Sequence, residues 1–117
     1  MARYEHLPIY KTGMELAVLM ENAVKTMSRY HKYTIGTDLR NRCLALVSLT
    51  ARANSSEDKQ PVLQEMRIVL EELKQILFLA KEIKALQSFL TYKEAMERVL
   101  SLSKQNEGWL RKMRVKS

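Results

Sequence analysis

Hydrophobic residues recur every three or four positions along most of this 117-residue chain. That spacing gathers them on one face of an α-helix. In residues 7–30, Leu16, Met20 and Val24 share one face, and the opposite face carries mainly charged and polar residues. Pro8 suits the first turn of a helix, where its missing N–H group is not needed. The pattern therefore predicts an amphipathic helix over residues 7–30.

A second periodic segment covers residues 35–54, and Thr34 and Thr37 are equally good N-caps for it. Its far side carries small and apolar residues, such as Leu44 and Ala45, which indicates a second packing surface. The stripe expected to face the core comprises Leu39, Cys43, Leu46, Val47, Thr50 and Ala53.

A third helix is expected over residues 60–86, with Pro61 in its first turn. Phe78, Ile68 and Leu79 add apolar surface beyond what one pair of neighbouring helices needs, which favours an oligomer. The expected seam comprises Val62, Met66, Val69, Leu73, Ile76, Ala80 and Ile83, and a second stripe beside it comprises Leu63, Leu70 and Leu77.

A fourth helix is expected over residues 91–112, where Thr91 and Glu94 have the spacing of a capping box. A basic tail, residues 111–117, follows it. The expected inner face comprises Tyr92, Ala95, Met96, Val99, Ser103, Asn106 and Leu110.

Four helices of about 20 residues, each ~30 Å long, with short connections most simply form one up-down-up-down bundle. The fold class is therefore all-α, with residues 1–117 in a single domain, and only three glycines and two prolines interrupt the helices. A single cysteine, the lack of an apolar leader and the lack of any long apolar run predict a cytoplasmic protein without a membrane segment.

No catalytic constellation is recognisable, and we expect neither enzymatic activity nor a cofactor. His6 and His31 lack the partners and spacing of a metal site, and the separated glycines cannot form a phosphate loop. Cys43 falls on an apolar stripe, where a buried, inert thiol is expected.

The net charge of +7 is distributed unevenly. Residues 25–53 hold six cations and one acid, whereas residues 57–87 hold five cations and six acids. The excess can be a solvated face or a surface that contacts phosphates. Tyr30 and Tyr33 lie between the cations, and each can either stack on an exposed base or cap the core, the latter being favoured for at least one of them. Gly36 is expected to form the turn between the first two helices.

Four segments carry a resemblance to a known family: Tyr33-Thr-Ile-Gly-Thr-Asp-Leu-Arg40, Ala53-Asn54-Ser55, Leu73 through Leu79-Ala80-Lys81-Glu82-Ile83, and Gly108-Trp109-Leu110. Their order and spacing over residues 7–112 resemble the bacterial four-helix-bundle family related to ribosomal-RNA intervening-sequence proteins. Within that family the chain is most similar to the accessory variability determinants of diversity-generating retroelements.

The resemblance implies a ring-shaped homopentamer that binds a retroelement reverse transcriptase and its template RNA, or DNA in its place. Such proteins support mutagenic complementary-DNA synthesis (mutagenic retrohoming) without catalysing it. Arg40, Lys74 and Lys81 match positions where the family places basic residues, whereas Phe78 stands where a cation is expected.

Eight cations are therefore the expected nucleic-acid contacts: Lys25, Arg29, Lys32, Arg40, Arg42, Arg52, Lys74 and Lys81. Two alternatives stay open. One is a protein associated with ribosomal-RNA intervening sequences that has no reverse-transcriptase partner. The other is a structural helical adaptor whose basic charge has no nucleic-acid role.

Overall fold

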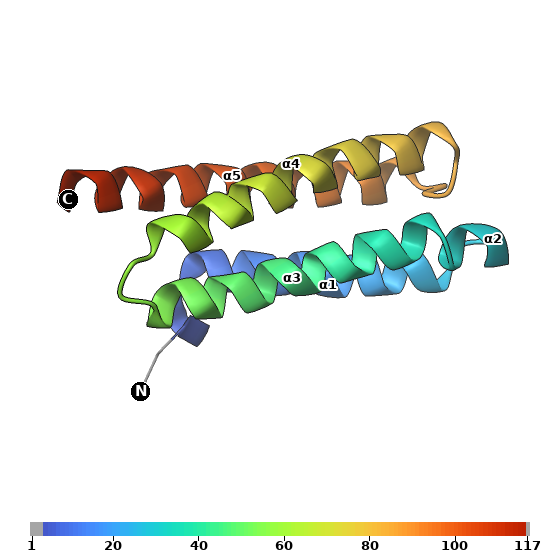
Figure 1. The fold of residues 1–117 in the computed structure, drawn as a ribbon. Coiled ribbons are helices and arrows are strands. Elements are labelled where there is room, and N and C mark those ends of the chain that lie inside the picture. Colours follow the sequence, from blue (N-terminus) through green and yellow to red (C-terminus); the bar gives the residue numbers. More distant parts are fainter. Residues whose placement is uncertain (1–3, 117) are drawn as a thin grey trace.

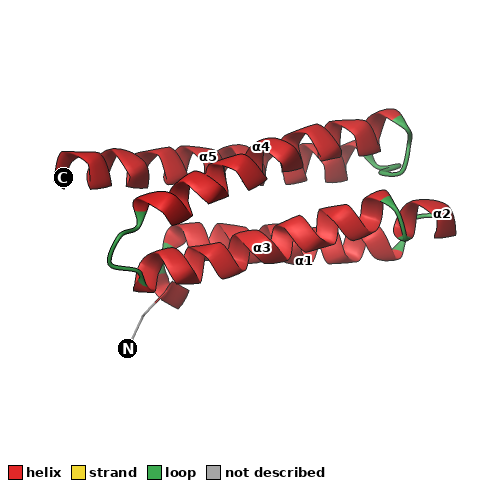
Figure 2. Ribbon diagram, in the orientation of Figure 1, coloured by secondary structure: helices red, strands yellow, loops and turns green. Residues whose placement is uncertain are grey.

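A computed structural model describes residues 4–116 of the chain. All regular structure in this described part is helical, as Figure 2 shows. The elements are a short 3-10 helix η1 (Tyr4–His6) and the α-helices α1 (Pro8–Lys25), α2 (Arg29–Lys32), α3 (Ile35–Ser55), α4 (Gln60–Glu82) and α5 (Phe89–Lys116).

The long helices α1, α3, α4 and α5 form a four-helix bundle, which confirms the predicted fold class (Figure 1). Neighbours along the chain pack antiparallel, and α5 packs against α1 to close the bundle. The molecule measures 47 × 25 × 21 Å. At one end, here called the α2 end, lie α2 and the α4–α5 connection; the α3–α4 connection and the last turns of α5 lie at the opposite end (Figure 1).

The core contains most of the predicted inner faces, and the clearest difference from the prediction is on α4. There Leu63, Leu70 and Leu77, predicted as a secondary stripe, are completely or almost completely buried. Ile83, predicted in the main seam, is exposed. The difference arises because α4 packs against both α3 and α5, so that the centre of its buried face lies between the two stripes.

The first helix is shorter than predicted, since α1 ends at Lys25 and not near residue 30. The Thr26 hydroxyl donates to the Ala23 carbonyl at 2.8 Å, and the Ser28 hydroxyl accepts from the His31 amide at 3.5 Å. Hydroxyl side chains that bond to nearby backbone compete with the helix and favour a new start. The chain therefore stops, buries Met27 and begins the one-turn helix α2.

Gly36 was predicted to form a turn, and this was wrong: it lies in the first turn of α3. Thr34 occupies the N-cap position, but its hydroxyl donates backward to the Tyr30 carbonyl at 2.8 Å and does not cap α3. Ile35 and Gly36 are both buried against the end of α1. The connection is thus fixed by close packing and by backbone hydrogen bonds of α2.

The third predicted helix also ends early, because α4 stops at Glu82 and not at residue 86. Lys84 adopts a left-handed conformation with φ of 62°, and the amides of Ala85 and Leu86 both donate to the Ala80 carbonyl. This is a helix-terminating arrangement of the Schellman kind, formed here without glycine. The apolar Ala85 and Leu86 continue the hydrophobic pattern but are buried in a turn.

The predicted capping box at Thr91 was likewise wrong, since α5 begins at Phe89. The Ser88 hydroxyl accepts from the Thr91 amide at 3.2 Å and supplies the cap. The predicted basic tail, residues 111–117, is helical as far as the structure describes it, because α5 continues to Lys116.

Candidate nucleic-acid interface

Three of the predicted contact residues lie close together in the sequence at the α2 end of the bundle. Lys25 is in the last turn of α1, and Arg29 and Lys32 belong to α2. Lys25 and Arg29 are exposed and Lys32 is partly buried. In the part of the chain that the structure describes, none of these three side chains has an ion pair or a hydrogen bond. We call these three residues the basic corner.

The predicted arginines of α3 differ from the basic corner because carboxylates of neighbouring helices compensate them. Each pairs with a glutamate of another helix: Arg40 with Glu21 of α1 at 2.8 Å, Arg42 with Glu72 of α4 at 3.5 Å and Arg52 with Glu65 of α4 at 3.6 Å. These pairs join α3 to both of its neighbours. Arg42 also pairs with Asp38 of α3 at 3.7 Å. Such exposed pairs stabilise a protein by at most about 1 kcal/mol each, but they lower the local positive potential.

The two predicted lysines of α4 are also paired, Lys74 with Glu71 at 3.4 Å and Lys81 with Glu82 at 3.3 Å. The Lys81 ammonium in addition lies 4.8 Å from the ring centre of Phe78 and 5.1 Å from that of Tyr92. Phe78, which stands where a cation was expected, therefore holds a cation over its face.

The structure does not bring all eight predicted residues to one surface. Arg52 is in the last turn of α3, at the opposite end from the basic corner, and Lys74 lies in the middle of α4. Lys81, in the last turn of α4, is at the α2 end. A cavity of about 210 Å³ lies between the end of α1, at Thr26, and the α4–α5 connection, at residues 85–88.

Lys84 is a further cation at this end that sequence reasoning placed inside a helix and did not select. It is exposed on the α4–α5 connection and has no ion pair with any described residue. Glycine or asparagine usually occupies a left-handed position at the end of a helix. A lysine there, as in Lys84, gives no sign in the sequence that the helix ends.

The two tyrosines of this end do not cap the core, contrary to the expectation for at least one of them. Tyr30 is 74% exposed and Tyr33 is 70% exposed. The ring of Tyr30 meets that of His31 edge-on at 5.4 Å between centres. Met27 and Ile35 supply the buried anchors on either side of α2 instead.

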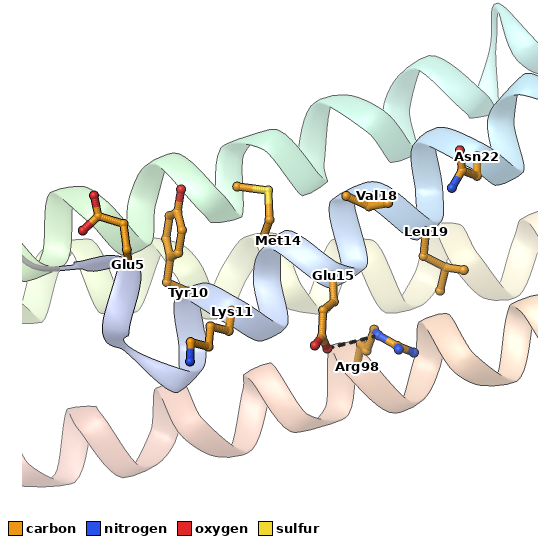
Figure 3. Close-up of a pocket in the computed structure, with 9 residues that line it drawn as sticks. All are labelled: Glu5, Tyr10, Lys11, Met14, Glu15, Val18, Leu19, Asn22 and Arg98. Carbon is orange, nitrogen blue, oxygen red and sulfur yellow. Dashed lines mark ion pairs between the residues drawn. The ribbon is translucent and has the colours of Figure 1, made fainter.

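A groove of about 570 Å³ lies on a different surface, along the outside of α1 (Figure 3). Tyr10, Met14 and Val18 follow one another along α1, and Arg98 of α5 reaches Glu15 with 3.6 Å between Nε and Oε1. None of the eight predicted contact residues lines this groove.

A second groove, of about 750 Å³, lies at the opposite end of the bundle, where Trp109, Arg111 and Lys112 meet the start of α1. Lys59 lines it too, but its ammonium donates to three carbonyls at the end of α3, including that of Ser56 at 2.8 Å. The positive charge of Lys59 therefore caps a helix.

Cys43 is the sole thiol of the chain, and it is buried. Burial raises the pKa of the Cys43 thiol to about 12, so the thiol stays protonated and unreactive near neutral pH. Among the described residues, no three His, Cys, Asp or Glu side chains are grouped as metal ligands. No helix in the described part of the chain is long and apolar enough to cross a membrane.

Comparison with known protein families, curated proteins and solved structures found no match. What bears on function is therefore the residue pattern and the geometry of the α2 end. That end combines a group of uncompensated cations with two exposed aromatic rings.

Proposed function

We propose that this protein is a non-enzymatic accessory protein that binds RNA through its phosphates at the α2 end. The observation that carries the proposal is the contrast between the basic corner and the other predicted contacts. Lys25, Arg29 and Lys32 have no carboxylate partner among the described residues, whereas the other five predicted cations each have at least one.

An uncompensated cation is better suited to bind a phosphate, because no internal ion pair must first be broken. Each phosphate contact also releases a counterion, which makes the affinity strongly dependent on salt. Three contacts on one protomer give only weak binding, but several copies placed around a ring multiply the number of contacts.

The proposed assembly is a ring-shaped homo-oligomer, with five copies by likeness to accessory variability determinants. Exposed apolar residues support an assembly, since Ile68, Phe78 and Leu79 of α4 are all more than half exposed. Apolar side chains gathered on one exposed helix are typical of a surface that another protein covers.

The same likeness suggests the biological role. The protein would hold template RNA beside a retroelement reverse transcriptase in the cytoplasm and so support mutagenic complementary-DNA synthesis. One surface would contact the enzyme while the basic corners of the ring contact RNA. The chemistry of synthesis would belong entirely to the reverse transcriptase.

RNA affinity measured against salt tests the proposal. The triple variant K25Q/R29Q/K32Q removes the basic corner, and K11Q/K104Q/K112Q removes the same charge from exposed positions on α1 and α5 away from the α2 end. We expect only the first variant to bind markedly less tightly. Its salt slope on a single strand should fall by about 0.7 for each phosphate that the variant no longer neutralises.

Two outcomes would favour the alternatives. A wild-type protein that binds no RNA at low salt would be a structural adaptor and would contradict the proposal. RNA binding without a reverse transcriptase encoded nearby, or without co-purification of that enzyme, would favour a protein of the ribosomal-RNA intervening-sequence kind.

A further inference from the structure

The α2 end exposes two aromatic rings, those of Tyr30 and Tyr33, to solvent. Tyr30 and Tyr33 are three residues apart, so their side chains lie on neighbouring positions of one helical turn. Neither phenol hydroxyl has a hydrogen bond to any described residue. Both tyrosines are therefore largely accessible to a ligand from solvent.

The backbone under the two rings is held in place. The Thr34 hydroxyl binds the Tyr30 carbonyl at 2.8 Å, and the Thr37 hydroxyl binds the Lys32 carbonyl at 3.3 Å. Beneath them, Gly36 packs so closely against the His31 carbonyl that a Cβ atom on Gly36 would lie 3.1 Å from it. A fixed backbone lowers the entropy lost when a ligand orders the side chains.

The two rings and the basic corner share one short stretch of the chain. Arg29 directly precedes Tyr30 and Lys32 directly precedes Tyr33, so phosphate-binding groups and rings lie at the same end of the bundle. Phosphates and bases alternate along a strand, and only a single strand exposes the faces of its bases. In a duplex the bases stay stacked on one another and cannot reach the rings.

We infer that Tyr30 and Tyr33 stack on unpaired bases, and that the protein therefore selects single-stranded over double-stranded RNA. The inference rests on the proposed function, since it names the form of RNA that the basic corner binds. Phosphate contacts of the basic corner supply the affinity that single-stranded and double-stranded RNA share. Stacking on the two rings adds affinity for single-stranded RNA alone.

The experiment compares an unstructured RNA of about 16 nucleotides with a blunt-ended RNA duplex of equal phosphate number, at one fixed salt concentration. Wild-type protein should bind the unstructured RNA more tightly. In Y30A/Y33A this preference should disappear, each truncation weakening single-strand binding by about fivefold or more, while affinity for the duplex stays unchanged. The control Y30F/Y33F keeps both rings and should keep the preference.

The possible failures are distinguishable. Wild-type protein that binds both RNAs equally, or a preference that survives in Y30A/Y33A, overturns this inference and leaves the proposed function standing. Absence of binding to either RNA contradicts the proposed function itself. A smaller native mass of Y30A/Y33A would mean that the rings contact another copy of the chain, and this would also overturn the inference.

Discussion

Gly36 is the residue whose lack of a side chain matters most. A Cβ atom there would lie 2.9 Å from Cγ1 of Val24 and 3.3 Å from Sδ of Met27, closer than normal contact. We expect Gly36→Ala to lower the free energy of unfolding by about 1–3 kcal/mol, because α1, α2 and α3 must move apart. Denaturant unfolding measures this decrease.

Gly13 is the matched control, since it also lies inside a long helix. A Cβ atom there would lie 3.9 Å from Val47, which is ordinary van der Waals contact. Gly13→Ala should therefore raise the free energy of unfolding by up to about 1 kcal/mol, through helix propensity alone. Equal effects of the two substitutions would contradict the special packing of Gly36.

Asn106 is a buried polar residue whose hydrogen-bonding capacity is only partly used. Its side chain is completely buried, Nδ2 donates to the Leu63 carbonyl at 2.9 Å, and Oδ1 has no partner among the described residues. We expect Asn106→Leu to raise the free energy of unfolding by about 1 kcal/mol. The substitution removes Oδ1, a buried acceptor to which no described group donates a hydrogen bond.

An adjacent cavity of about 340 Å³, which Asn106 lines, gives a larger side chain room. Asn106→Asp places a carboxylate in the same buried position and should be strongly destabilising near neutral pH. Denaturant midpoints of both variants check this ordering, and the reverse ordering would mean that Oδ1 is satisfied in solution.

At the scale of the helices, a bidentate salt bridge between Arg67 and Glu107 joins α4 to α5. Both nitrogen–oxygen distances, Nε–Oε2 and Nη2–Oε1, are 2.7 Å. Hydrogen bonding from Arg67 holds the pKa of Glu107 below its ordinary value, and nearby Arg114 and Arg111 act in the same direction. The contact therefore depends on the ionised carboxylate.

A pH dependence follows with a definite sign. Because the folded pKa of Glu107 is lowered, its stabilisation is present above the ordinary value of about 4.3 and is lost as pH falls through the lowered value. Glu107→Gln should melt at a lower temperature than the wild type near neutral pH, and the difference should vanish in acid. Thermal unfolding of both proteins over pH tests this, and a constant difference would argue against the linkage.

The sequence predicted the existence and inner faces of the long helices, both ends of α3 and the starts of α1 and α4 to within one residue. It did not predict where α1 and α4 end or where α5 begins and ends. Periodicity identifies a helix because apolar residues must face the core at every turn. Helix ends depend on single contacts, such as the hydroxyl of Ser88 or the left-handed Lys84, which a propensity argument does not contain. Buried residues in a turn, such as Leu86, also extend the apolar pattern past the helix.

At the scale of the whole molecule, the basic region could be predicted from the sequence only in part. Composition indicated the excess charge around residues 25–53. Which cations stay uncompensated depends on contacts between helices: Arg40 is paired only because α1 brings Glu21 beside it. That pair joins residues far apart in the sequence, and no local pattern reveals it.

The proposed ring gives a prediction at this scale. Native mass measurement should give five times the chain mass of 13.7 kDa. Replacing two exposed apolar residues of α4, Ile68→Glu together with Leu79→Glu, should release single chains, because burying the new carboxylates is unfavourable. The control Leu100→Glu changes an equally exposed leucine on α5. A wild-type protein that is monomeric would contradict the ring.

The closure of the bundle by α1 and α5 also bears on how the chain folds. The other helix pairs join neighbours along the chain, whereas α1 and α5 come from its two ends, and a wide groove and long polar contacts accompany their junction. Contacts between distant segments have the largest loop-closure cost during folding, and regions with few buried contacts open at the lowest free energy. We therefore expect α5 to swing away from α1 in partial unfolding, while α3 and α4 keep their pairing and the α2 end keeps its shape.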